Sequence, residues 1–188
     1  MRKIIVFNHI SLDGYFVDRN GQMNWAHSPA DDQEWNAFVS QNASGSAVFL
    51  FGRVTYDLMA GFWPTPMAHQ NMPDVAAAMN KTPKLVVSRK LDNVTWQNAK
   101  LMKGDLISEM RRLKQEPGDD FVIFGSGTIV KQLAEAGLID EYQLVVNPIA
   151  LGAGRTLFDG LKNNVALKLS KSRAFSNGNT VLSYVPPA

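Results

Sequence analysis

The chain has 188 residues, of which 45% are hydrophobic and 19% are charged, and this balance suits a single globular domain over residues 1–188. Its formal net charge of +2 is too small to predict nucleic-acid binding, and the lack of cysteine excludes disulfides, thiolate metal sites and cysteine nucleophiles. No apolar stretch approaches the roughly 20 residues that a membrane span needs. The N-terminus starts basic and then apolar, as a signal peptide would, but its apolar run stops at Ser11 and contains Asn8 and His9. A first strand and a cytoplasmic protein are therefore expected.

Short branched runs that are apolar on both faces alternate with helical patterns along the chain. In chain order, the pattern predicts a strand at 3–10, a helix at 28–41, strands at 47–51 and 84–88, a helix at 105–115, a strand at 121–124 and a helix at 128–137. Strands of this kind are typical of parallel sheets that helices cover on both sides. The first helix is expected to start with Ser28 as N-cap, Pro29 at the first helical position and Asp31 in the first turn.

After residue 140 the pattern becomes strand-like, over 140–149, 165–175 and 179–185, with a hairpin turn at 176–178. The predicted fold class is α/β. We expect a three-layer αβα arrangement, with a mainly parallel central sheet and an antiparallel hairpin at its C-terminal end.

Ligands of such sheets bind beyond the carboxyl ends of the strands, where helix N-termini present free N–H groups. Three strand ends combine glycines, hydroxyls and cations. They carry Gly52, Arg53 and Thr55 in "GRVTYD", Ser88 and Arg89 in "SRK", and Gly125, Ser126, Gly127 and Thr128 in "GSGT". An ordinary turn or helix cap explains any one of them, but the three together favour a site for several phosphates.

Gly125 and Gly127 raise the question of what approaches the backbone so closely there. The dinucleotide fingerprint is incomplete, because "GSGTIV" lacks the third glycine and no acidic residue ends a strand about 20 residues later. The Walker pattern is missing too. A nucleotide cofactor would therefore be held by a different arrangement.

Five segments carry a resemblance to a known family. They are "NHISLDGYF" (8–16), "LFGRVTYD" (50–57), "LVVSRK" (85–90), "FGSGTIVKQLAEAGLIDEYQL" (124–144) and "PIALGAGRTLFD" (148–159). Together they resemble the dihydrofolate-reductase-like fold, in particular the C-terminal reductase domain of the bifunctional riboflavin-biosynthesis deaminase-reductase and its stand-alone relatives. The resemblance implies a reductase that uses NADPH and acts on a small molecule.

The resemblance also assigns residues to the cofactor. Positions that match Arg53 and Thr55, next to Gly52, lie near its phosphates, and those that match Ser88 and Arg89 hold the adenosine 2′-phosphate. The segment that matches Gly125, Ser126, Gly127 and Thr128 wraps the pyrophosphate with backbone N–H groups. On this interpretation the glycines clear space for a diphosphate, and the helix dipole favours its charge.

By the same resemblance, the nicotinamide lies against the end of the first strand, near Asn8, His9 and Ile10. Asp13 in "SLDG" is then the catalytic carboxylate that faces the substrate, although Asp-Gly is also a common turn dipeptide. Trp25 is a further candidate for substrate contact.

Other residues near the expected substrate have two interpretations each. Arg155 either binds a substrate phosphate or caps its loop. Asp31 and Asp32 follow Trp25 as the acid of dihydrofolate reductases follows a tryptophan, but the spacing is longer. At a helix N-terminus both aspartates also complement the dipole.

Two departures from the family patterns bear on the substrate. No arginine precedes the strand at 84–88, so true dihydrofolate reductase activity is not expected. The arginine-rich middle segment of the riboflavin reductases is replaced by residues 60–80, which are apolar and almost uncharged. This segment forms either a lid or wall for a flatter substrate, or a packed connection or subunit contact.

The histidines His9, His27 and His69 have no metal-ligand spacing, so no metal site is expected. The sequence predicts an NADPH-dependent reductase of a pteridine- or pyrimidine-like ring, best labelled 5-amino-6-(5-phosphoribosylamino)uracil reductase-like. Two alternatives stay open: an NADPH-binding protein without catalysis, acting as a sensor or assembly partner, and a promiscuous reductase of quinones or nitro compounds. Pairing into a homodimer is expected from the resemblance, while nucleic acid and membrane are not expected as partners.

Overall fold

The computed structural model describes residues 1–26, 32–43 and 45–187. Its central sheet has eight strands in the order β5-β4-β3-β6-β1-β7-β10-β9. They are β1 (Ile4–Ser11), β3 (Ala47–Gly52), β4 (Lys84–Val87), β5 (Ala99–Met102), β6 (Asp120–Phe124), β7 (Glu141–Asn147), β9 (Lys168–Ala174) and β10 (Thr180–Val185). The strands from β5 across to β7 pair in parallel, whereas β10 is antiparallel to both β7 and β9. The predicted parallel sheet with its C-terminal antiparallel hairpin is confirmed.

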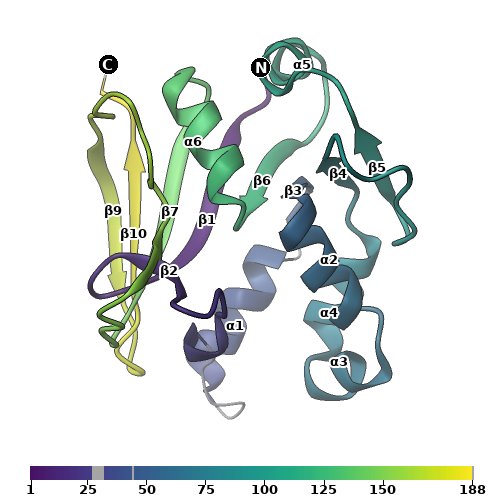
Figure 1. Ribbon diagram of the computed structural model, residues 1–188. Coiled ribbons are helices and arrows are strands. Elements are labelled where there is room, and N and C mark those ends of the chain that lie inside the picture. The colour runs from purple at the N-terminus through teal and green to yellow at the C-terminus, as the bar shows by residue number, and fades with distance from the viewer. Residues whose placement is uncertain (27–31, 44, 188) are drawn as a thin grey trace.

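Helices cover both faces of this sheet, so the predicted three layers are confirmed (Figure 1). The helices are α1 (Gln33–Ala43), α2 (Arg53–Phe62), α3 (Pro66–Asn71), α4 (Pro73–Lys81), α5 (Leu106–Gln115) and α6 (Gly127–Glu135), with a short 3-10 turn η1 (Asn24–Ala26). On one face α5 and α6 pack against residues such as Val6 and Ile123. On the other face α2 and α4 pack against Phe49 and Phe51.

The alternation of side chains explains why the strands are apolar throughout. Leu50 joins the core under α5 and α6, while its neighbours Phe49 and Phe51 join the core under α2 and α4. Successive side chains of a strand point to opposite faces, so a strand between two helical layers needs apolar residues at every position.

The boundaries differ from the expected ones mainly at α1. Asp32 caps this helix, since its Oδ1 accepts a hydrogen bond of 3.0 Å from the backbone N–H of Trp35. The helix therefore begins at Gln33, and the expected start at Ser28, Pro29 and Asp31 lies outside the described residues.

Three short strands and the helices α3 and α4 were not predicted, and α2 was expected only as a helical turn that contains Thr55. The strands are β5, β2 (Tyr15–Asp18) and β8 (Gly154–Thr156), of which β2 and β8 form a separate two-stranded ribbon. Within residues 60–80, α3 and α4 each begin with a proline, and Val75, Ala76 and Met79 are buried. This segment is therefore a packed part of the fold, although Met67 and Met72 on its outer side are exposed.

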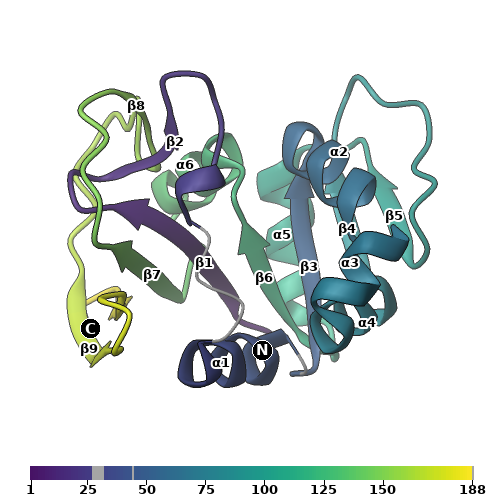
Figure 2. The same cartoon turned by 90° about the horizontal axis from the view of Figure 1, so that it is seen from below.

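Parallel strands carry their carboxyl ends to one edge of the sheet. Figure 2 shows the arrowheads of β1, β3 and β6 at the same end of the molecule, with the β2–β8 ribbon on one side and the start of α2 on the other. Within the described residues, no helix is long and apolar enough to cross a bilayer.

Candidate functional site

Hydrogen bonds from polar side chains connect the carboxyl ends of β1, β3 and β6. The backbone N–H of Gly52 donates to Ser126 Oγ at 2.7 Å, and Thr55 Oγ1 lies 2.9 Å from the same oxygen. On the other side, the N–H of Gly125 donates to Asn8 Oδ1 at 2.7 Å. The structure thus brings together residues that the sequence placed at three separate strand ends.

Two helix N-termini meet at this point. Gly52 is the N-cap of α2 and Ser126 is the N-cap of α6, and neither helix has a side-chain cap. The first turn of a helix leaves N–H groups without an intrahelical partner and carries the positive end of the dipole. The junction of α2 and α6 therefore favours an anion.

The glycines make room for the protein's own side chains. A Cβ atom on Gly52 would lie 2.8 Å from Ser126 Oγ, one on Gly125 would lie 3.0 Å from Thr55 Oγ1, and one on Gly127 would lie 3.3 Å from the Phe16 ring. Gly125 also has a φ of +63°, which side chains disfavour. The sequence attributed these glycines to a diphosphate, but the close approach seen in the structure is made by Ser126, Thr55 and Phe16.

Ser126 adopts an unusual backbone conformation to make this arrangement. Its φ of 60° and ψ of 59° are left-handed, which costs a residue with a Cβ atom about 1–2 kcal/mol. This conformation directs Oγ to Gly52 and Thr55. Strain of this kind persists where the surrounding contacts impose it, and it is concentrated at functional sites.

Asn8 contributes a donor that the fold leaves unused. Because the N–H of Gly125 requires an acceptor, Oδ1 of Asn8 must face it, and Nδ2 points elsewhere. Asn8 is 3% exposed, and Nδ2 is buried with no hydrogen-bond partner among the described residues. An unpaired buried donor costs about 1–3 kcal/mol, so this atom is suited to an acceptor on a bound molecule.

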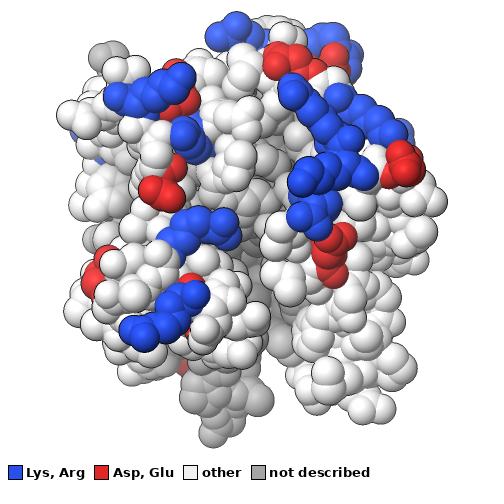
Figure 3. All heavy atoms as spheres, viewed as in Figure 1, with Lys and Arg blue, Asp and Glu red and all other residues white. Residues whose placement is uncertain are grey.

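The residues at the end of β4 are adjacent to this junction but separate from its hydrogen-bond network. Ser88 is buried, and its Oγ accepts bonds of 3.1 Å from the N–H groups of Lys90 and Leu91, which shapes the turn after β4. Arg89 is exposed, as is Arg53, which pairs with Asp57 at 3.2 Å. In the space-filling view, lysine and arginine side chains lie on both sides of a hollow that runs down the middle of this face (Figure 3).

Asp13 follows the end of β1 and accepts hydrogen bonds from three groups of the protein. It accepts from Ser11 Oγ at 2.6 Å, from the N–H of Gly152 at 2.7 Å and from the N–H of Leu151 at 3.1 Å. These bonds, led by that from Ser11, lower the pKa of Asp13 to about 2. Asp13 is exposed and ionised at neutral pH, so it can accept hydrogen bonds from a ligand but cannot donate a proton.

The other residues expected near a substrate lie at the same edge of the sheet. The indole N–H of Trp25 donates to the carbonyl of Gln22 at 3.2 Å. The carbonyl of Ile10 accepts from Asn147 Nδ2 at 3.1 Å, and Nδ2 of Asn147 also lies 3.3 Å from Nδ1 of His9. Arg155 is exposed on β8, with its guanidinium carbon 5.2 Å from the centre of the Phe16 ring. His27 and Asp31 lie outside the described residues.

Comparison with known proteins agrees with this architecture. The family model for the RibD C-terminal domain matches residues 2–181. The chain belongs to the RibD C-terminal domain family. The uncharacterized protein YyaP of Bacillus subtilis is 27% identical over 183 residues, which are 97% of this chain and 94% of that protein.

Two solved structures share the fold of this RibD C-terminal domain protein. A protein of Shewanella sp. PV-4, provisionally named as a riboflavin biosynthesis protein, superposes with a TM-score of 0.76 at 24% identity, over 99% of both chains. A diaminohydroxyphosphoribosylaminopyrimidine deaminase/5-amino-6-(5-phosphoribosylamino)uracil reductase from Thermotoga maritima gives 0.73 at 14% identity, over 99% of this chain and 57% of that one. The resemblance to riboflavin-pathway reductases, seen first in the sequence, is confirmed at the level of family and fold.

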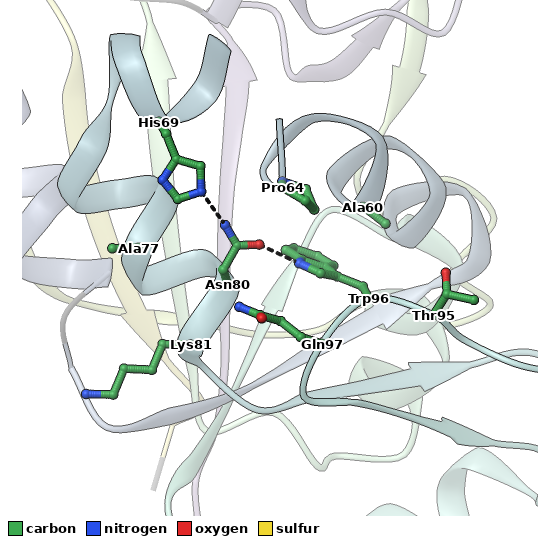
Figure 4. Close-up of a pocket in the computed structure, with 9 residues that line it drawn as sticks. All are labelled: Ala60, Pro64, His69, Ala77, Asn80, Lys81, Thr95, Trp96 and Gln97. Atoms are coloured by element: carbon green, nitrogen blue, oxygen red, sulfur yellow. Dashed lines mark hydrogen bonds between the residues drawn. The ribbon is translucent and has the colours of Figure 1, made fainter. Parts of the chain in front are cut away.

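A cavity elsewhere in this RibD C-terminal domain contains none of the expected site residues. It has a volume of about 550 Å³ and lies between the ends of α2 and α4, α3 and the loop before β5. Figure 4 shows Asn80 at its centre, where Oδ1 accepts from the indole N–H of Trp96 at 2.7 Å and Nδ2 lies 3.3 Å from His69 Nε2. Asn80 is thus hydrogen-bonded to both Trp96 and His69. Among the described residues, no three acidic or histidine side chains are grouped as a metal site requires.

Sequence reasoning missed the contacts that hold the site together. It named Ser126 and Gly52 but not their mutual bond, and it did not find Phe16, Leu151 or Gly152 as partners. Leu151 and Gly152 donate to Asp13 through their backbone N–H groups. Nearly every residue type has such a group, so the sequence does not indicate these partners. Phe16 does carry a signal in the sequence, because it is the second of two aromatic residues, Tyr15 and Phe16, that follow "SLDG".

Proposed function

We propose that this protein is an NADPH-dependent reductase of a pyrimidine- or pteridine-like ring, with activity similar to that of 5-amino-6-(5-phosphoribosylamino)uracil reductases. The observation that carries the proposal is the meeting of the α2 and α6 N-termini, through Gly52 and Ser126, beside the unpaired donor of Asn8. A solved structure with the same fold is named for this activity, and that supports the ring chemistry.

The residues fit a diphosphate-bearing cofactor at the helix junction. The first-turn N–H groups of α6, from Gly127 and Thr128, bind phosphate oxygens, and Arg53 adds a positive charge. The N–H groups of Gly52 and Gly125 are already bonded within the protein, so they position the loop around the cofactor instead of touching it. Ser88 shapes the turn that presents Arg89 to the 2′-phosphate.

NADPH supplies a hydride when bound, and the protein supplies position and charge. Asn8 Nδ2 donates to a carbonyl of the nicotinamide or the substrate, while Ile10 and Trp25 line the reacting end. Asp13 remains an anion, so it orients a donor group of the substrate and leaves the proton for the product to come from water.

A cofactor-binding protein without turnover is the second candidate. The full set of hydrogen bonds on Asp13 favours it, because a carboxylate that clamps the 151–152 loop has a structural reason to be present. The quinone or nitro reductase alternative rested on an apolar wall at residues 60–80. Val75 and Met79 of this segment are buried in the core, whereas Met67 and Met72 are exposed, so this alternative stays open. The cytoplasmic location and the homodimer stay predictions.

The oxidation of NADPH, followed at 340 nm with a panel of ring substrates, tests the proposal. The panel contains the phosphorylated aminouracil, its dephosphorylated form, pteridines and simple quinones. Turnover with a pyrimidine or pteridine supports the reductase. Tight NADPH binding without turnover of any panel member would rule out the reductase and favour the cofactor-binding protein.

A further inference from the structure

A second hollow lies on the β2–β8 ribbon. It has a volume of about 410 Å³ and is lined by Val17, Asp18, Arg19, Gly21, Gly154 and Arg155. The two strands pair antiparallel, with Val17 opposite Arg155 and Asp18 opposite Gly154. Two arginines 136 positions apart in the chain are therefore brought to one concave surface.

Bare backbone forms part of this hollow. A Cβ atom on Gly154 would lie 2.1 Å from the carbonyl oxygen of Val17, so no other residue fits there without displacing the ribbon. Gly21 has a φ of +75° in the turn after β2. That turn is held by Asp18, whose Oδ1 accepts 2.8 Å bonds from the N–H groups of Asn20 and Gln22. The hollow is thus a fixed shape built on two glycines and one capped turn.

The charge of the hollow is positive. Arg19 and Arg155 outnumber Asp18, whose Oδ1 is already engaged by two backbone N–H groups. In the described part of the chain, neither arginine has a carboxylate within ion-pair distance. Arg155 lies over the Phe16 ring, which leaves the edge of its guanidinium, with its N–H donors, available.

The hollow is also close to the strand-end junction. Phe16 lies between the two, because its ring is next to Gly127 at the start of α6, where an added Cβ atom would come within 3.3 Å of it, while Arg155 lies over its face. A ligand seated at the α6 N-terminus therefore reaches the two arginines by extending past the Phe16 ring.

We propose that the hollow binds a phosphate monoester carried by the substrate, with Arg19 and Arg155 as its two cationic ligands. A guanidinium binds phosphate with paired N–H donors. Two guanidinium groups match the two negative charges of a phosphate monoester on a flexible sugar. The hollow as a phosphate site rests on the geometry alone, whereas its assignment to the substrate rests on the proposed reductase function.

The test uses the whole protein and two probes, ribose 5-phosphate and inorganic phosphate, in calorimetric titrations. Arg19→Ala and Arg155→Ala are each expected to raise the Kd for ribose 5-phosphate about tenfold, and Arg155→Lys by less, since lysine keeps the charge but not the paired donors. Lys171→Ala, which removes one exposed charge from the distant strand β9, is the matched control and is expected to leave the Kd unchanged. Equal affinities in the arginine variants and the native protein, or an equal loss in the control, would overturn the site.

Two further measurements separate the possible sources of the phosphate. Arg19→Ala is expected to leave the Kd for NADPH within twofold of the native value, because the proposed cofactor phosphates lie at other residues. A tenfold loss of NADPH affinity would mean that the hollow binds the cofactor instead. With the phosphorylated aminouracil, Arg19→Ala is expected to raise KM without changing kcat, and with the dephosphorylated form to change neither. If no ring is reduced while ribose 5-phosphate binding still depends on both arginines, the reductase proposal fails and the phosphate site stands.

Discussion

Ser126 Oγ lies 2.7 Å from the backbone nitrogen of Gly52 and joins the N-termini of α6 and α2. The same oxygen lies 2.9 Å from Thr55 Oγ1, so one hydroxyl group fixes the distance between the ends of β3 and β6. On the proposed function, the donors of both helix N-termini converge on a cofactor phosphate only while the two helices keep this spacing.

Ser126→Ala is expected to destabilise the protein by about 1 kcal/mol, because the N–H of Gly52 loses its acceptor. It is also expected to weaken NADPH binding several-fold, because the two helix N-termini are no longer held together. Ser126→Gly lacks the hydroxyl too but relieves the left-handed strain, so it should be more stable than the alanine variant and bind NADPH as weakly. Urea unfolding and fluorescence titration measure the two effects, and native affinity in both variants would show that the hydroxyl does not order the site.

Gly125→Ala tests the close approach of Thr55. The new Cβ would lie 3.0 Å from Thr55 Oγ1 and would also need a φ of +63°. Gly137→Ala is a matched control, since its φ is +64° and nothing lies within 4 Å of the added atom. The control is expected to lose about 1 kcal/mol from backbone strain, and Gly125→Ala to lose at least about 1 kcal/mol more. Equal losses in the free energy of unfolding, measured with urea, would mean that Thr55 does not restrict the side chain at position 125.

Asp13→Asn tests the role of Asp13, whose carboxylate is ionised throughout the neutral pH range. The pKa of Asp13 is lowered from 3.8 to about 2, so the native state favours the ionised form. The stability from these hydrogen bonds is present above pH 4 and is lost as the pH falls through 2. The variant should therefore show a weaker acid dependence of unfolding between pH 5 and 2.

The same variant is expected to lower kcat and to keep the native Kd for NADPH, because the proposed function assigns Asp13 to the substrate. The shape of the kcat profile between pH 5 and 9 should not change. Loss of an ionisation from that profile would instead identify Asp13 as the proton donor.

Lys84 provides a pH-dependent test of the fold. It is 2% exposed, and its ammonium donates to the carbonyls of Thr82 at 2.6 Å, Asn80 at 3.1 Å and Gln97 at 3.3 Å. Burial lowers the pKa of Lys84 from 10.5 to about 8. Between these values the unfolded chain binds more protons than the native state, so this residue makes the free energy of unfolding rise with pH.

Lys84→Met should remove that rise. The difference between the native protein and the variant is expected to grow in favour of the native protein by about 1 kcal/mol per pH unit from pH 8 to 9.5. This window stays below the range where Tyr142, whose pKa burial raises to about 12, has the opposite effect. Parallel curves for the two proteins would mean that Lys84 titrates normally.

The layers of the fold could be predicted because local patterns reflect burial. A strand such as β3 is apolar at every position because helices lie on both sides, and the turn at Asp13 and Gly14 forms as its dipeptide indicates. The helices α3 and α4 also carried a signal, since Pro66 and Pro73 occupy the first helical position in each. Their apolar composition was compatible with a ligand wall or with a packed connection, and only the structure shows that Val75, Ala76 and Met79 lie in the core while Met67 and Met72 are exposed.

The candidate site was predictable in residue types but not in contacts. Glycine at 52, 125 and 127 indicates a close approach without stating what approaches, and the structure gives that place to Ser126, Thr55 and Phe16. These pairs are up to 111 residues apart in the chain (127 minus 16), and a contact over such separations leaves no mark in a single sequence.

The discrimination between NADPH and NADH tests the account most directly. We predict that the native protein binds NADPH at least about tenfold more tightly than NADH in a fluorescence titration, and that Arg89→Ala removes most of the difference by weakening NADPH alone. Lys168→Ala on β9 is the charge-matched control and should keep the native preference. Equal affinity of the native protein for the two dinucleotides, or no measurable binding of either, would contradict a nicotinamide cofactor held at these strand ends.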